Sequence, residues 1–228
     1  MTDFNSLTAS QLGDMIGQRK IDPVELTEHF LSQIELSPIG RKIYSTVTFK
    51  LALEQAKDSK KRADAGRRLS SLDGVPISWK DLFDISGYPC EAGSELLAGR
   101  LAVKNAKVYN FAEAHGLICL GKTHMSELAF SGLGLNPISE TPPCVNYPES
   151  VPGGSSSGAA TSVSFGLAAA GIGSDTGGSV RIPAAWNDLV GFKTTAGKLS
   201  LNGVVPLCSR FDTVGPLTKS VEDAARLF

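Results

Sequence analysis

The sequence predicts an α/β protein whose sheet is covered by helices. From about Leu72 onward, short apolar runs alternate with helical segments, reading GVPISW, NAKVYNFAEAHG, LICLG, an alanine-rich stretch and LVGFKT. Such alternation is typical of a sheet with helices on its faces. With 228 residues, 42% hydrophobic content and 24 glycines, the chain is long enough for one large domain with a sizeable core.

Helical segments precede this alternation. A first helix is expected around Thr8 to Gly17, and Asp22-Pro23 marks the start of a second, because aspartate caps helices and proline suits their first turn. Ile43 to Phe49 is rich in β-forming residues. Leu51 to Arg68 has the pattern of an exposed amphipathic helix.

These patterns divide the chain into an N-terminal helical segment, residues 1–70, that packs on a core of residues 71–228. Within the core, Ser131 to Gly154 is dense in Pro, Gly and Asn, which predicts a long functional loop. A last helix is predicted after Ser220, a good N-cap, and the sequence stops at Phe228 without a C-cap. We therefore expect these residues to be an N-terminal part of a longer fold.

Composition and charge favour small-molecule chemistry. The formal net charge is −1, so no basic surface for direct nucleic-acid binding is expected. The first thirty residues lack the apolar run of a signal peptide, and no segment has the length of a membrane span. The four cysteines and three histidines show no metal-ligand spacing. We expect reduced thiols, a cytoplasmic protein and no metal; a homodimer is possible.

Two serines on glycine-rich turns are the candidate reactive groups. They lie in GGSSSGAATSVSFGLAAAGIGSDTGGSVRIPA, which runs from Gly153 to Ala184. Glycine lets backbone amides approach a reacting atom, and a serine there can attack a carbonyl if a base takes its proton. His29 and His115 lie in helical patterns, and His124 follows Gly-Lys-Thr, so none lies in a glycine-rich turn.

Lys80 is the candidate base, because it ends the apolar run GVPISW. Considered alone, a lysine at a strand end favours snorkelling to solvent. Considered together with the serine motif, it favours a buried amine whose pKa is lowered toward the neutral, proton-accepting form.

These residues resemble the amidase signature family, serine hydrolases that use a Ser-Ser-Lys triad. The likeness runs from roughly Leu72 to Phe228 and includes GVPISWKD before the glycine-rich stretch and VGFKTTAGKLS after it. It implies the family's fold, a central mixed sheet covered by helices on both faces. It also implies an amidase that hydrolyses a small-molecule amide through a serine acyl-enzyme, without a cofactor.

The resemblance assigns roles to individual residues. Ser179 matches the nucleophile, Ser155 the bridging serine that follows a cis peptide in this family, and Lys80 the general base. Backbone N–H groups of Thr176, Gly177, Gly178 and Ser179 are expected to form an oxyanion hole. If Ser179 opens a helix that runs to Trp186, the positive helix end would add to this stabilisation.

Neighbouring polar residues are expected to support the site. The resemblance implies that Asp175 and Arg181 hold the turn through hydrogen bonds and an ion pair, whereas Ser156 belongs to a network or caps a helix. Asp188 stands where many relatives have glycine, and Thr194 replaces a common proline. Trp79, Met125 and Phe130 are candidate pocket residues, for which core packing is an equal explanation.

Three alternatives remain open. Gly116 to Thr123, GLICLGKT, fits the phosphate-loop pattern of a nucleotide-binding protein, although its apolar residues form a strand rather than a turn. The same triad would also serve the glutaminase (A-type) subunit of a tRNA-dependent amidotransferase. Finally, residues 1–228 alone would be inactive if the missing half shapes the cleft.

Overall fold

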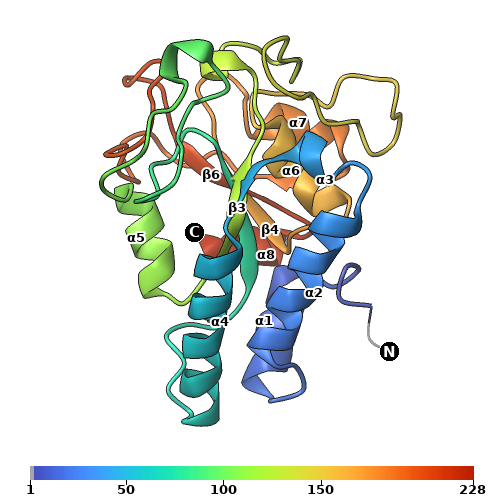
Figure 1. Cartoon of the computed structure of the whole chain (residues 1–228), viewed down its shortest axis with the longest axis vertical. Helices are drawn as coiled ribbons and strands as arrows, with labels where there is room; N and C mark the ends of the chain where they lie inside the picture. Colours follow the sequence, from blue (N-terminus) through green and yellow to red (C-terminus); the bar gives the residue numbers. More distant parts are fainter. Residues whose placement is uncertain (1–2) are drawn as a thin grey trace.

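A computed structural model describes residues 3–228, which build a mixed six-stranded sheet between layers of helices (Figure 1). The helices are α1 (Ala9–Gly17), α2 (Pro23–Leu36), α3 (Gly40–Ile43), α4 (Phe49–Asp64), α5 (Lys107–Ala114), α6 (Ser157–Ser164), α7 (Arg181–Trp186) and α8 (Val221–Leu227). The strands are β1 (Tyr44–Val47), β2 (Pro76–Lys80), β3 (Ile118–Thr123), β4 (Ala170–Ser174), β5 (Val190–Gly191) and β6 (Val214–Thr218). Short 3₁₀ turns occupy Glu95–Leu97 and Glu127–Ala129.

The sheet has the strand order β1-β3-β2-β4-β6-β5. Its centre is parallel, since β2 pairs in parallel with both β3 and β4, whereas β1, β6 and β5 pair antiparallel toward the edges. The carboxyl ends of parallel strands meet at one edge of a sheet, where α/β proteins place their sites. Here that edge receives Lys80, Thr123 and Ser174, the last residues of β2, β3 and β4.

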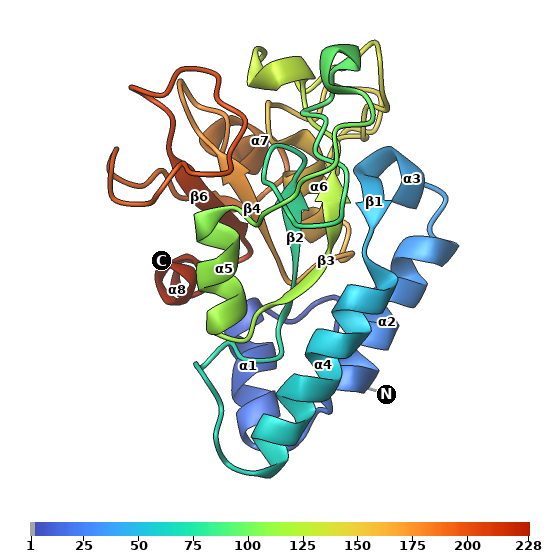
Figure 2. The ribbon, with the colours of Figure 1, turned by 60° about the vertical axis from the view of Figure 1, so that its left-hand side comes forward.

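Helices cover both faces of the sheet. Side chains alternate between these faces along β2, so each residue of β2 packs against the helices on one face. Ser78 Oγ lies 2.7 Å from Ser162 Oγ of α6, whereas the Trp79 ring lies 5.2 Å from that of Tyr109 in α5. Lys80 therefore shares the α6 face with Ser78. Figure 2 shows α5 and α8 on one side of the sheet and α6 on the other. The predicted α/β fold is confirmed.

The helices predicted around Thr8 to Gly17, from Asp22-Pro23 and after Ser220 are confirmed. Thr8 forms a capping box with Gln11 at the start of α1, and Asp22 caps α2, whose first residue is Pro23. The Ser220 side chain accepts the Asp223 N–H at the start of α8. The α2 and α4 helices pack on each other and on β3, and β1 adds a strand from within residues 1–70 to the sheet.

Three boundaries differ from the sequence prediction. The β-rich segment yields only Tyr44–Val47 as strand β1, and the amphipathic helix α4 runs from Phe49 to Asp64. The helix expected from Ser179 begins at Arg181 instead. The Asp175 carboxylate accepts the N–H groups of Val180 and Arg181, so the residues before them form an open turn.

Strand β4 lies in the alanine-rich segment, and its glycines allow α6 to pack closely against it. A Cβ on Gly171 would lie 2.6 Å from the Ala159 carbonyl oxygen, and one on Gly173 would lie 2.6 Å from Ser156 Oγ. The approach of α6 brings the segment that precedes it, with Ser155, over the ends of β2 and β4. The predicted loop from Ser131 to Gly154 contains no helix or strand.

Candidate active site

Lys80 is fully buried at the end of β2 and faces hydroxyl groups. Its Nζ lies 2.6 Å from Ser155 Oγ and 2.9 Å from Ser174 Oγ. Within residues 3–228 it forms no ion pair with a carboxylate. Burial lowers the pKa of Lys80 to about 7, against the opposing negative charges of Asp175 and Asp212. The amine is thus poised to exchange a proton near neutral pH.

Ser155 is held between three segments. Its carbonyl oxygen accepts the Ser126 N–H at 3.1 Å, and the peptide bond that joins it to Gly154 is cis. The next N–H, of Ser156, donates to the carbonyl oxygen of Ser179 at 3.2 Å. The structure therefore brings Lys80, Ser155 and Ser179 together, although the hydroxyls of Ser155 and Ser179 are not hydrogen-bonded to each other.

The turn from Thr176 to Ser179 presents unused backbone donors. Within the described residues, the N–H groups of Thr176, Gly177, Gly178 and Ser179 donate to no protein acceptor. Gly177 is exposed, and a Cβ built on it would meet nothing within 4 Å. Consecutive free N–H groups beside open space form a concavity suited to an anion.

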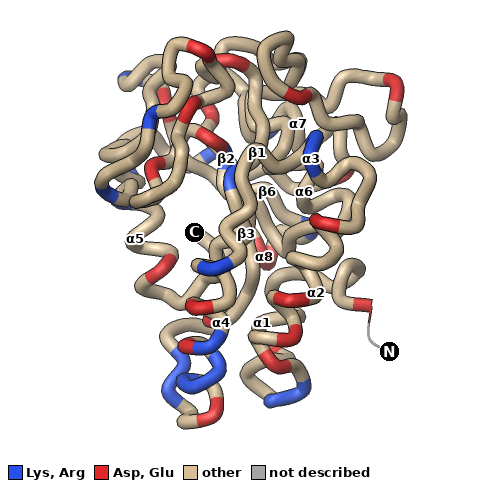
Figure 3. The backbone as a smooth tube through the Cα atoms, in the orientation of Figure 1, with Lys and Arg blue, Asp and Glu red and all other residues tan. Residues whose placement is uncertain are grey.

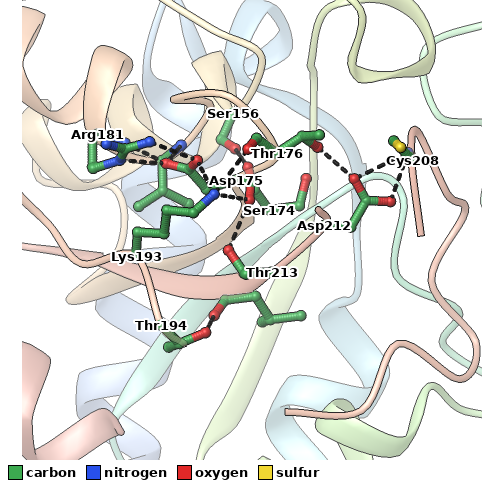
Figure 4. A network of polar contacts seen from close by, with 12 residues as sticks. Ser156, Ser174, Asp175, Thr176, Arg181, Lys193, Thr194, Cys208, Asp212 and Thr213 are labelled. Carbon is green, nitrogen blue, oxygen red and sulfur yellow. Dashed lines mark hydrogen bonds and ion pairs between the residues drawn. The ribbon is translucent and has the colours of Figure 1, made fainter. Parts of the chain in front are cut away.

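The Asp175 side chain holds the turn from Thr176 to Ser179 in place through hydrogen bonds and ion pairs (Figure 4). The buried carboxylate receives the Arg181 guanidinium at 2.9 and 3.1 Å and Lys193 Nζ at 2.9 Å. Burial alone would raise the pKa of Asp175, but the hydrogen bonds from Arg181 and Lys193 outweigh it and hold that pKa below its usual range. The contacts are those expected of Asp175 and Arg181, whereas Lys193 was not singled out from the sequence.

Ser156 lies in the network rather than capping a helix through its side chain. Its hydroxyl donates to the Ser174 carbonyl oxygen at 3.3 Å, and it makes no capping hydrogen bond to α6.

Three further polar residues lie at the site and were not predicted from the sequence. Ser174 contacts Lys80, Asp212 accepts the Thr176 hydroxyl, and Thr213 donates through N and Oγ1 to the Asp175 carbonyl oxygen at 3.1 and 2.7 Å. Ser174 could have been found as the strand residue directly before Asp175. No local pattern marks Asp212 or Thr213, because they reach the turn only through the pairing of β4 with β6.

The remaining candidates differ in burial and in the side of the sheet that they face. Within residues 3–228, no histidine side chain bonds to Ser155 or Ser179; His29, for example, contacts Asn5. Trp79 faces α5 and lines a cavity of about 450 Å³ on the opposite side of the sheet from Lys80. Met125 is buried and Phe130 is 82% exposed.

The phosphate-loop pattern is a strand in the structure. Its residues Ile118–Thr123 form β3, and Lys122 is buried with its Nζ bound to Asp81 and to the Pro89 carbonyl. A phosphate-binding lysine must be free to reach its ligand, so the structure does not support the nucleotide-binding alternative.

Basic residues gather at one end of the molecule, remote from this site (Figure 3). They lie at the C-terminal end of α4 and just beyond it, within KDSKKRADAGRR, residues 57–68. Several are neutralised by acids, as Lys61 is by Asp58 and Arg62 by Asp73. In the part of the chain described, no helix is both long and apolar enough to cross a bilayer.

A mixed sheet covered by helices on both faces is also the fold of the solved amidases that this chain resembles. The chain belongs to the amidase family, whose model matches residues 25–228.

Individual relatives agree with this family. The chain is 37% identical to the A-type subunit of the glutamyl-tRNA(Gln) amidotransferase of Acinetobacter baylyi, over 100% of this chain and 46% of that protein. It is 41% identical to the corresponding protein of Anaeromyxobacter dehalogenans, over 94% of this chain and 44% of that protein. The native peptide amidase of Stenotrophomonas maltophilia superimposes with a TM-score of 0.92 at 29% identity, over 99% of this chain and 47% of that one. The chain spans about half the length of these relatives.

Proposed function

We propose that the protein hydrolyses a carboxylic amide to an acid and ammonia or an amine, through an acyl-enzyme on Ser179. The observation that carries this proposal is the buried Lys80 amine, whose pKa is lowered to about 7 and which lies 2.6 Å from the Ser155 hydroxyl. A neutral amine in that position can accept a proton that an isolated serine cannot lose near neutral pH.

The proposed chemistry moves protons through Ser155. The Ser179 hydroxyl gives its proton to Ser155 Oγ as Ser155 gives its own to neutral Lys80, while Ser179 Oγ bonds to the amide carbon. The carbon–nitrogen bond then breaks as the leaving nitrogen takes a proton back along the same path. Water, activated in the same way, hydrolyses the ester and frees Ser179. Hydrogen bonds of unliganded sites commonly tighten when substrate binds, and this relay needs such a contact between the two serine hydroxyls.

The oxygen of the attacked carbonyl becomes negative, and we assign its stabilisation to the free N–H groups of Thr176 to Ser179. Each such donor is typically worth about 3 kcal/mol in the transition state. Gly177 supports this assignment because the space beside its Cα is empty, so a reacting group has room there.

A second candidate is that the amide is the side chain of glutamine and that the ammonia passes to a partner. The relatives named as parts of an amidotransferase, at 37 and 41% identity, favour it. The two hypotheses share the same steps, so ammonia release from glutamine that requires an added partner protein would decide for the second.

We also propose the cytoplasm as the location, which the four unpaired cysteines support. We further propose that residues 1–70 form a helical segment that packs on a core of residues 71–228, and that the protein forms a homodimer.

Covalent labelling with a fluorophosphonate tests the nucleophile. We expect peptide mass spectrometry to find the label on Ser179 and the Ser179→Ala variant to lose labelling and amide hydrolysis. Ser157→Ala is the matched control, since within residues 3–228 the Ser157 hydroxyl donates a hydrogen bond only to the His124 carbonyl oxygen, at 3.4 Å. A label on another serine, or labelling that survives in Ser179→Ala, would refute the assignment.

A further inference from the structure

Lys193 makes contacts that the proposed chemistry does not yet use. Its Nζ donates to the carbonyl oxygens of Asp175 and Thr176, at 2.8 and 2.9 Å, and to the Asp175 carboxylate at 2.9 Å. One ammonium group therefore uses all three of its hydrogens on two consecutive residues. Figure 4 shows the amine directed at this pair from the segment that follows β5.

The two carbonyls belong to the peptide units that carry the N–H groups of Thr176 and Gly177. A peptide unit is planar, and in its trans form the C=O and N–H bonds point in opposite directions. An ammonium that holds both oxygens on one side fixes both N–H bonds toward the other side. Those N–H groups have no protein acceptor within residues 3–228, and the Gly177 position opens onto empty space.

The charge of Lys193 adds to this geometric effect. A hydrogen bond to a carbonyl oxygen polarises its peptide unit and strengthens the N–H group as a donor, and a charged donor does so more than a neutral one. The Asp175 carboxylate keeps the ammonium in place, and the Thr213 N–H and hydroxyl hold the same Asp175 carbonyl oxygen at 3.1 and 2.7 Å.

We propose that Lys193 is a positioning residue for the reaction: by holding the carbonyls of Asp175 and Thr176, it aims and polarises the Thr176 and Gly177 amides at the developing oxyanion. This inference rests on the proposed function, because it assigns those amides a reacting partner. Lys193 itself touches no reacting atom.

The test separates reversible binding of a fluorophosphonate from its covalent step at Ser179. Oxyanion donors act in the transition state, so Lys193→Met should lower the maximal labelling rate about 100-fold and leave the reagent's reversible dissociation constant within about twofold. Lys198→Met is the matched control: it removes a lysine from the same segment that makes no hydrogen bond to the turn, and it should label like the wild type.

A conservative variant keeps the test decisive if Lys193→Met folds poorly. In Lys193→Arg the charge remains, but a planar guanidinium cannot place one nitrogen on all three acceptors, so we expect an intermediate loss of about tenfold in the maximal rate. An unchanged maximal rate in either variant would overturn the inference and leave the proposed function standing. Absence of label on wild-type Ser179 would overturn both.

Discussion

Two lysines lie fully buried in neighbouring parallel strands of this sheet, and they differ in the groups that face them. Lys122 Nζ in β3 lies 2.7 Å from an Asp81 carboxylate oxygen. Among the residues that the structure describes, Lys80 Nζ at the end of β2 forms hydrogen bonds only with the hydroxyls of Ser155 and Ser174. Burial removes water from both amines, but of the two only Lys122 lies in direct contact with a carboxylate.

The comparison shows that the partner, rather than burial alone, decides what a buried lysine can do. A carboxylate in contact favours the ammonium form and makes the pair part of the framework. Hydroxyls leave most of the cost of burying a charge uncompensated, so the neutral amine becomes accessible and can serve as a base. Replacing Lys80 should therefore slow the reaction, whereas replacing Lys122 should lower the stability of the fold.

The largest expected effect is on the chemistry. Lys80→Met keeps the length of the side chain but removes the base, so we expect labelling of Ser179 by a fluorophosphonate to slow by about 10²–10⁴-fold at pH 8. The protein should remain folded, because no charge is left without its partner. A variant that keeps more than about a tenth of the wild-type rate would show that Lys80 is only structural.

The next effect is on stability. Lys122→Met leaves the Asp81 carboxylate buried without its cation, and urea denaturation should show a loss of about 3–5 kcal/mol in the free energy of unfolding. Adding Asp81→Asn should restore part of that loss, since the unpaired charge is gone. If Lys122→Met instead stays stable and loses labelling as Lys80→Met does, the distinction between the two lysines is wrong.

Much of the fold follows from local signals that the structure confirms. Thr8, Asp22 with Pro23, and Ser220 begin helices because their side chains accept N–H groups that a helix start leaves free. Strand β6 was not predicted, since Val214–Thr218 contains glycine and proline and shows no alternation. It forms because β4 and β5 pair with it from both sides, and such pairing is invisible in a local pattern.

The site could also be predicted in part, because some of its residues carry local sequence signals and others are brought in only by strand pairing. Lys80 was found as a lysine that ends an apolar run, and Lys193 carries the same signal after LVGF, although it was not recognised. Asp188, which the resemblance to the family marks as a departure from glycine, adopts a positive φ of 56°, a backbone conformation that glycine adopts without strain. The contacts of Asp212 and Thr213 depend on how β6 lies against β4, and only the folded structure reveals them.

The most direct test of the central claim is the ionisation of Lys80 itself. An NMR titration of the protein with isotope-labelled lysine would follow each lysine side-chain amine. The signal that is missing from the spectrum of Lys80→Met is the signal of the Lys80 amine. We predict a midpoint near 7, with the Lys80 amine losing its proton as the pH rises through that value, far below the ordinary lysine pKa of 10.5. Wild-type labelling of Ser179 should rise over the same pH range. A midpoint near 10.5 would make Lys80 a permanent cation at neutral pH and would contradict its role as the base.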